Sequence, residues 1–391
     1  MELSNFRRFL LDRGMVYFYA IFVAGYFLLP MASGHRQLYY VLVMPAVLLL
    51  WRELLAFYRG NFLSSLLLLY ATYMLITLLW TADFSAEEAG RTAGYSLALL
   101  TFCFISGYLW VAQGPWMDTL AHRALYLAAA AAAVSIVAWY ATHPFPESRV
   151  IPLGVMHHEN KASCAYGLFL VLCTHYLFSE RGRDNKITYL ALGLVLLSMV
   201  LLTQSRTALA AVSVALVTLI GYRALGLLAV GAAVSWALLA ANTALWQSRV
   251  MTFSFRPGIW EQVLLNMDGY WWFGHGYLMS PRVAAYDKVF DHAHNGYLAS
   301  LRDGGIIGLL LLLAILGTAG LWAWRLYRQD GERIYMALLL YGVTAITMDF
   351  DRLLVHPKEL WLFFWLPVAL IMAVYAKRDD PERVRYHGQT S

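Results

Sequence analysis

The sequence predicts an all-α polytopic integral membrane protein with about twelve transmembrane helices. Hydrophobic residues make up 60% of the chain and charged residues only 14%, whereas about 25% charged residues is usual in soluble domains. Apolar stretches of about 20 residues, the length that crosses a bilayer, recur along the chain. The low charge and the 15% of aromatic residues exclude a disordered chain, and three cysteines are too few for a disulfide scaffold. We therefore expect a single transmembrane domain over residues 1–391.

Twelve stretches are apolar enough to be predicted as spans. They cover residues 15–33, 38–57, 61–80, 92–112, 122–141, 162–178, 187–203, 207–221, 223–243, 305–324, 334–350 and 359–376. The stretches 207–221 and 223–243 form either one hairpin or a pair that is divided elsewhere. The first stretch follows three arginines, as a signal peptide would, but its length and the lack of a small-residue cleavage site favour a retained span. Cys103, Cys164 and Cys173 fall within spans, where we expect small core residues.

The distribution of basic residues predicts that both termini are cytoplasmic. With the N-terminus inside and alternating spans, the cytoplasmic side carries the excess of Lys and Arg, as the positive-inside rule requires. The basic cytoplasmic segments are Trp51–Gly60, Ser179–Lys186, Arg325–Arg333 and the tail from Lys377. The net charge of +5 is therefore a topology signal and not the footprint of nucleic-acid binding, for which we find no motif.

Polar residues concentrate on the predicted outer side. Its longest loop, residues 243–304, is inserted between spans nine and ten, and loops of this length are usually functional. Trp271, Trp272 and Phe273 indicate short amphipathic helices of this loop in the membrane interface. Eight of the eleven histidines are also on this side: His35, His143, His157, His158, His275, His292, His294 and His356. Because the span centres carry almost no charge, we favour an enzyme at the outer face over a transporter.

His294 is the candidate catalytic residue. It precedes Asn295 and, nine residues later, Gly305 and Gly308 open an apolar run, so an outer loop enters the tenth span at this point. A neutral imidazole can accept a proton at working pH. The alternative is an interfacial histidine followed by helix-packing glycines. His292 makes a metal site conceivable, but the histidines are not four apart and no cysteine stands at ligand spacing, so we expect no metal and no other cofactor.

Two arginines are candidate ligands of an anionic substrate. Arg206 lies at the outer turn between spans seven and eight, where Ser205 or Thr207 could cap the next helix, and Arg256 lies in the long loop. Arg206 could instead place its charge at the membrane surface without binding anything. Arginine binds phosphate oxygens bidentately, so two arginines and a histidine on one face suggest a reaction on a lipid diphosphate. No Asp-x-Asp motif is evident in a predicted outer loop, which leans away from a metal-dependent glycosyltransferase.

Four further residues are candidate substrate contacts. Trp260 could stack on a sugar or anchor the loop in the interface. Asn160 could cap the sixth span or bond to the diphosphate or sugar, and Lys161 could add positive charge. His275 stands between Gly274 and Gly276 in the long loop.

These motifs together resemble the O-antigen ligase and O-antigen polymerase superfamily of bacterial inner-membrane enzymes. The resemblance rests on Asn160, on Ser205 with Arg206, on Arg256 with Trp260 leading to Gly274–Gly276, and on His294 and Asn295 followed by Gly305 and Gly308. Twelve spans and one long outer loop are most similar to the ligase branch. Glu159 departs from the pattern, because proline is the commoner residue there.

The resemblance implies a membrane glycosyltransferase of the C type, with its active site on the periplasmic face. It would transfer O-antigen glycan from undecaprenyl diphosphate to a sugar hydroxyl of lipid A–core by metal-independent, inverting chemistry. His294 would be the general base, Arg206 and Arg256 would hold the diphosphate, and Asn295, Asn160 and Lys161 would be supporting contacts. An O-antigen polymerase or a protein O-oligosaccharyltransferase carries the same motifs, and a lipid or glycan transporter is the alternative from another class.

Overall fold

Helices dominate the computed structural model, which describes residues 3–82, 84–145, 147–179, 185–221 and 255–379, and single positions 224, 226, 229 and 231. Runs of Leu, Ala, Val and aromatic residues make the helices apolar on most of their circumference, as buried or membrane helices are. The first predicted span lies in a continuous helical segment made of α1 (Leu3–Phe9), a π-helical turn (Leu10–Gly14) and α2 (Met15–Leu28). The second predicted span is formed by α3 (Ala32–Leu38), a π-helical turn (Tyr39–Val43), α4 (Met44–Leu49) and α5 (Trp51–Phe57), with a bend of 66° before α5.

The remaining helices overlap the predicted spans. Their bounds are α6 (Phe62–Ile76) with a 3-10 turn (Thr77–Trp80), α7 (Ala86–Ala112), α8 (Gly114–Tyr140), a 3-10 turn (Gly154–Met156), α9 (Glu159–Phe178), α10 (Lys186–Leu202), α11 (Arg206–Ile220), α15 (Gly296–Asp330), α16 (Ile334–Met348), and a π-helical turn (Trp361–Trp365) that leads into α17 (Leu366–Asp379). Of these, α7, α8 and α15 begin six to nine residues earlier than predicted. Among the described residues, seven helices are long and apolar enough to cross a membrane, or eight with the bent pair, and α10, α11 and α16 are shorter apolar helices. The chain is therefore a multi-pass membrane protein. Twelve spans stay a prediction, because most of 223–243 lies outside the described residues.

One hydrophobic cluster runs through the bundle. α17 packs against α7, while α11 packs against α16 and α9. Trp361 and Trp365 are fully buried at the centre, just before α17. Cys103, Cys164 and Cys173 are free and buried, as predicted for core residues.

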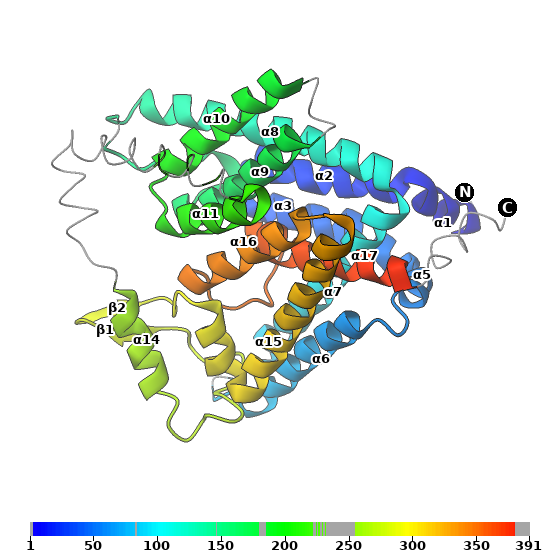
Figure 1. Cartoon of the computed structure of the whole chain (residues 1–391). Helices are drawn as coiled ribbons and strands as arrows, with labels where there is room; N and C mark the ends of the chain where they lie inside the picture. Colours follow the sequence, from blue (N-terminus) through cyan, green and yellow to red (C-terminus); the bar gives the residue numbers. More distant parts are fainter. Residues whose placement is uncertain are drawn as a thin grey trace.

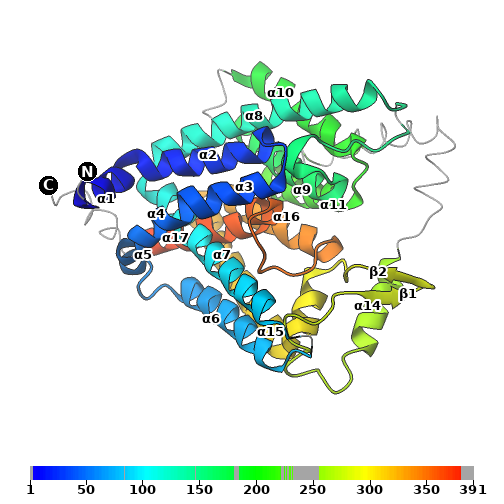
Figure 2. The ribbon, with the colours of Figure 1, turned by 180° about the vertical axis from the view of Figure 1, so that it is seen from behind.

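The two ends of the bundle differ in structure. α1, α5 and the end of α17 lie at one end, and the elements of the long loop lie at the other (Figures 1 and 2). Residues 255–295 of this loop contain α14 (Arg256–Leu265) and an antiparallel hairpin of β1 (Val283–Ala285) and β2 (Lys288–Phe290), and the sequence did not predict the hairpin. α14 packs on β1 through Ile259 and Val263. Residues 243–254 of the predicted loop lie outside the described residues.

The loop contains a short helix, α14, as expected, but the structure differs from two expectations in detail. Trp271, Trp272 and Phe273 lie in turns and not in a short helix, although their side chains are exposed, as expected of interfacial residues. The tenth span was predicted to begin at residue 305, but α15 begins at Gly296 and breaks at Gly305, whose φ is +64°. Hydropathy missed the first turns of α15 because they carry the charged pair Arg302 and Asp303.

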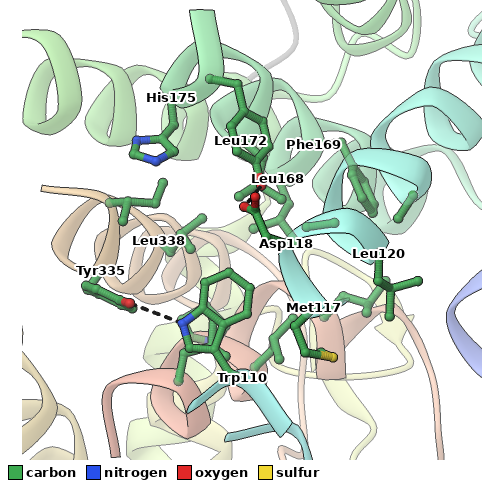
Figure 3. A pocket seen from close by; sticks show the side chains of 18 of the residues that line it. Trp110, Met117, Asp118, Leu120, Leu168, Phe169, Leu172, His175, Tyr335 and Leu338 are labelled. Carbon is green, nitrogen blue, oxygen red and sulfur yellow. Dashed lines mark hydrogen bonds between the residues drawn. The ribbon is translucent and has the colours of Figure 1, made fainter. Parts of the chain in front are cut away.

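An apolar cavity of about 510 Å³ lies between α8, α9 and α16 (Figure 3). It is lined by Met117 of α8, by Leu168 and Leu172 of α9 and by Leu338 of α16, with Asp118 as a polar residue on its wall. A hydrogen bond of 3.1 Å from the indole of Trp110 to the hydroxyl of Tyr335 closes one side. This cavity is separate from the histidine and arginines that the sequence singles out.

Candidate functional site

His294 is held at the start of α15 by its neighbour. The Asn295 side chain caps this helix, because its Oδ1 accepts hydrogen bonds from the backbone N–H groups of Tyr297 at 2.9 Å and Leu298 at 3.1 Å. His294 itself has a φ of +50°, a backbone conformation that is uncommon for residues other than glycine, although histidine adopts it more often than most. Such strain persists only where the surrounding structure fixes the residue, and it is common at functional sites.

The ring of His294 is bound to a carboxylate. Its Nδ1 lies 2.9 Å from Oδ1 of Asp349, which follows directly after α16. The His294 side chain is 29% exposed and that of Asp349 is 8% exposed, so the histidine faces outward and the carboxylate is behind it. Because a carboxylate can only accept, Nδ1 carries the hydrogen and Nε2 of the neutral ring is the proton acceptor.

Asp349 is ionised in this setting. Burial by itself would raise its pKa, but the interactions with the His294 ring and the N–H of Phe350 outweigh burial, and the pKa lies well below its usual value. The second oxygen, Oδ2, accepts a hydrogen bond of 3.2 Å from Nδ2 of Asn160. A negative charge is therefore fixed directly behind the imidazole.

Asn160 is part of this cluster and does not cap α9. The capping position is His158, whose side chain makes no capping hydrogen bond, so the capping alternative for Asn160 was wrong. Arg149 donates to Oδ1 of Asn160 at 2.7 Å and to Oε1 of Glu159 at 2.9 Å. Its Nε donates to the carbonyl of Thr203 at 2.9 Å. Glu159, the residue that departs from the family pattern, thus anchors the arginine that orients Asn160.

The two candidate arginines each stand at the first position of a helix. Ser205 caps α11 through a hydrogen bond from the N–H of Ala208, as one alternative predicted, and Arg206 is exposed next to it. Arg256 begins α14, and its Nη2 lies 3.5 Å from the hydroxyl of Thr207. Burial lowers the pKa of Arg256, Asp349 opposes that shift and the charge of Arg206 adds to it. The contact with Thr207 places Arg256 beside the first turn of α11, within electrostatic range of Arg206 and Asp349.

Lys161 adds to the positive charge around the histidines. It is half-buried and follows Asn160 in the first turn of α9. The pKa of His292 is lowered to about 4, first by burial, then by its interaction with His294, with a further contribution from Lys161. His292, His294 and Asp349 also offer three ligand atoms within 4.8 Å of one another, a grouping that could hold a metal ion.

Trp260 and His275 brace the loop. The indole of Trp260 donates to the carbonyl of Ala293 at 3.1 Å, next to His294. Nε2 of His275 lies 2.9 Å from the carbonyl of Asn266, and its ring stacks on Tyr270 with centroids 4.0 Å apart. Within the described part of the chain we find no contact between His275 and the pair formed by His294 and Asp349.

Backbone hydrogen bonds join the break in α15 to the long loop. The backbone N–H of Ile306 donates to the carbonyl of Trp271 at 2.7 Å, and that of His275 donates to the carbonyl of Arg302 at 2.8 Å. A Cβ on Gly305 would lie 2.3 Å from the carbonyl oxygen of Trp272. The glycine motif thus allows a close approach of two backbones as well as helix packing.

A buried ion network ties the segment after α16 to this break. Arg302 contacts Asp303 at 2.7 Å and Asp351 at 3.0 Å, and Arg352 contacts Asp303 at 2.8 Å. Sequence reasoning missed this network, and it also missed Asp349 and Arg149. The available signal was the cluster of three charged residues within four positions, from Asp349 to Arg352, at the end of an apolar span.

Two comparisons with known proteins bear on this site. Residues 191–313 match the family model described as O-antigen ligase. The chain is also 28% identical to an O-antigen ligase of Pseudomonas aeruginosa over 369 residues, which cover 91% of this chain and 89% of the relative. The resemblance to the O-antigen ligases is confirmed. It supports O-antigen ligation as the general function and a glycosyltransferase type of enzyme.

The O-antigen ligase match covers only part of the site. It includes Arg206, Arg256 and His294, but Asn160 precedes it and Asp349 follows it. The tertiary structure adds these last two residues to the histidine and the arginines.

Proposed function

We propose that this protein is an O-antigen ligase, which transfers O-antigen glycan from undecaprenyl diphosphate to a sugar hydroxyl of lipid A–core. The observation that carries the proposal is the hydrogen bond between His294 and buried Asp349, with Arg256 in contact with Thr207, the residue after Arg206. The resemblance to O-antigen ligases over 91% of the chain supports the choice of donor and acceptor. The excess of basic residues at the opposite end supports an active site on the periplasmic face of the bacterial inner membrane.

In the proposed reaction, the acceptor hydroxyl attacks the anomeric carbon of the donor glycan. The new glycosidic C–O bond forms as the C–O bond to the diphosphate breaks, with inversion at that carbon. Nε2 of His294 takes the hydroxyl proton, and the charge of Asp349 stabilises the imidazolium that results. Asn160, held by Arg149, keeps the Asp349 carboxylate in place.

The leaving diphosphate gains negative charge as its bond breaks. Arg206 and Arg256 stabilise this charge in our proposal, with Lys161 as a further cation. Both arginines stand at helix N-termini, where the backbone also favours anions. Arginine supplies permanent positive charge without a metal ion, so we propose a metal-independent transfer.

The supporting residues receive revised proposed roles. Asn295 acts by capping α15 and thereby positioning His294, and Trp260 acts by holding Ala293. The contacts of His275 favour a role in bracing the loop over the substrate contact inferred from the sequence.

Purified protein, incubated with undecaprenyl-diphosphate-linked glycan and lipid A–core, tests the proposal. We expect glycan-capped lipid A–core to form in the presence of a chelator. Longer glycan on the lipid carrier would instead identify a polymerase, and glycosylated protein would identify an O-oligosaccharyltransferase. Movement of the lipid-linked glycan across vesicles without a covalent product would identify a transporter. Activity that is lost with the chelator and restored by added metal would contradict the metal-independent mechanism.

A further inference from the structure

His292 stands beside the proposed catalytic pair without a role in the transfer. The ring centroids of His292 and His294 are 3.9 Å apart, and the backbone N–H of His294 donates to Nδ1 of His292 at 3.1 Å. One ligand atom each from His292, His294 and Asp349 lie within 4.8 Å of one another. The three residues come from the segment before α15 and from the end of α16.

Two imidazoles and one carboxylate form a ligand set that suits zinc. Zinc sites with three protein ligands keep a fourth position for water or another small ligand. Ligands of a tetrahedral Zn²⁺, at about 2.0–2.1 Å from the ion, lie about 3.3 Å from one another. Nδ1 of His294 and Oδ1 of Asp349 are 2.9 Å apart and the three ligand atoms lie within 4.8 Å of one another, so small side-chain shifts bring all three to this spacing: the hydrogen-bonded pair opens slightly and His292 moves inward. His292 lies in the short segment between β2 and α15, where such a shift does not disturb a helix.

We propose that His292, His294 and Asp349 bind Zn²⁺, and that the bound ion inhibits glycan transfer. A neutral imidazole has one lone pair, which can accept either a proton or a metal ion but not both. Zinc on Nδ1 of His294 would replace the hydrogen that this nitrogen donates to Asp349, and the neutral ring would then carry its hydrogen on Nε2. Nε2 could no longer accept the proton of the acceptor hydroxyl. Asn160, which donates to Asp349, would orient the carboxylate ligand from outside the site. Imidazole ligands favour Zn²⁺ over the oxygen-seeking Mg²⁺ and Ca²⁺. The binding stands on geometry alone, whereas the inhibition rests on the proposed function.

Calorimetric titration of Zn²⁺ into the full-length, chelator-treated protein, purified without a polyhistidine tag, tests the binding. The diagnostic variant is His292→Asn, because the asparagine oxygen can still accept the His294 N–H while the imidazole ligand is lost. We expect its Kd for Zn²⁺ to rise at least about tenfold, since loss of an outer-shell partner alone costs about 10–100-fold. The control His157→Asn, at an exposed histidine before α9, should bind like the wild type, and Mg²⁺ should give no heat.

Equal zinc affinity of His292→Asn and the wild type would overturn the site, and so would equal weakening by His157→Asn. X-ray absorption at the zinc edge of the wild-type complex is independent of how the variants fold. Scattering from two imidazoles is expected, and a shell without imidazole would refute the ligand set.

The inhibition is measured separately in the transfer assay. Zn²⁺ should inhibit the wild type at the concentration at which it binds, and at least about tenfold more should be needed for His292→Asn. Zinc binding by a protein that transfers no glycan would support the site and contradict the proposed function. A protein that transfers glycan but neither binds zinc nor is inhibited by it would contradict only the metal site.

Discussion

Nδ1 of His294 and Oδ1 of Asp349 lie 2.9 Å apart, although 55 positions separate the two residues in the chain. The helices α15 and α16 run between them, and both residues are at the same end of these helices. This contact fixes which ring nitrogen carries the hydrogen, and it places a buried negative charge behind a partly exposed base.

Replacing His294 tests the proposed general base. We expect His294→Ala to abolish O-antigen-capped lipopolysaccharide on a gel. His294→Asn should slow transfer by about 10²–10⁴-fold, the usual contribution of a general base. Asparagine tolerates the φ of +50°, so this variant separates lost chemistry from backbone strain. Both variants should remain folded in the membrane, and His157→Asn serves as the control. Normal capping by His294→Asn would refute the assignment.

Replacing the arginines tests the proposed diphosphate site. Arg206→Ala and Arg256→Ala should each lower kcat by about 10²–10³-fold, as expected when one donor to a developing negative charge is removed. Arg206→Lys should retain part of the activity, because lysine keeps the charge but not the bidentate geometry. Arg282→Ala removes an exposed arginine from the same loop and should have little effect. Loss of activity in all three alanine variants alike would show that only the total charge matters.

The lowered pKa of Asp349 predicts a pH-dependent stability. A carboxylate whose pKa is depressed in the folded state contributes stability above its unfolded pKa, which is about 3.9 for Asp, and loses it as the pH falls further. Asp349→Asn should therefore unfold at a lower temperature than the wild type at pH 7, and the gap should shrink below about pH 4. Thermal unfolding in detergent measures this difference. Asp291→Asn, at an exposed carboxylate nearby, should show no such gap, and a gap for Asp349→Asn that stays constant down to pH 3 would contradict the charge argument.

The break in α15 is predicted to depend on Gly305. Gly305→Ala should destabilise the protein by more than about 1–2 kcal/mol, because alanine is strained at positive φ and its Cβ would meet the carbonyl of Trp272. The matched control is Gly317→Ala in the same helix, where a Cβ meets nothing within 4 Å. That variant should be neutral or more stable by about 0.5–1 kcal/mol. Thermal unfolding and transfer assays compare the two, and equal effects would mean that the break has no special requirement for glycine.

Much of the candidate site was accessible from the sequence, because its residue types are unusual for their surroundings. Arg206, Arg256, Asn160, Lys161 and His294 were singled out as polar groups beside apolar runs, and the structure gathers them at one end of the bundle. Asn160 was recognised, but the sequence left open that it caps a helix, which was wrong. A helix cap and a buried contact to a distant carboxylate have the same local pattern. Asp349 was taken as the end of a span, because its partner lies in another helix.

By itself, the sequence determined the class of the protein, most of its helices and the end of the bundle that holds the polar residues. Each of these follows from the transfer of short segments out of water, which depends on local composition. Only the tertiary structure decided that Asp349, 189 positions from Asn160, joins Asn160 and His294 in one cluster. It also decided that α15 breaks at Gly305 to receive the long loop. These contacts depend on how distant helices pack, and the hydropathy of each helix does not specify which side chains of its neighbours it will meet.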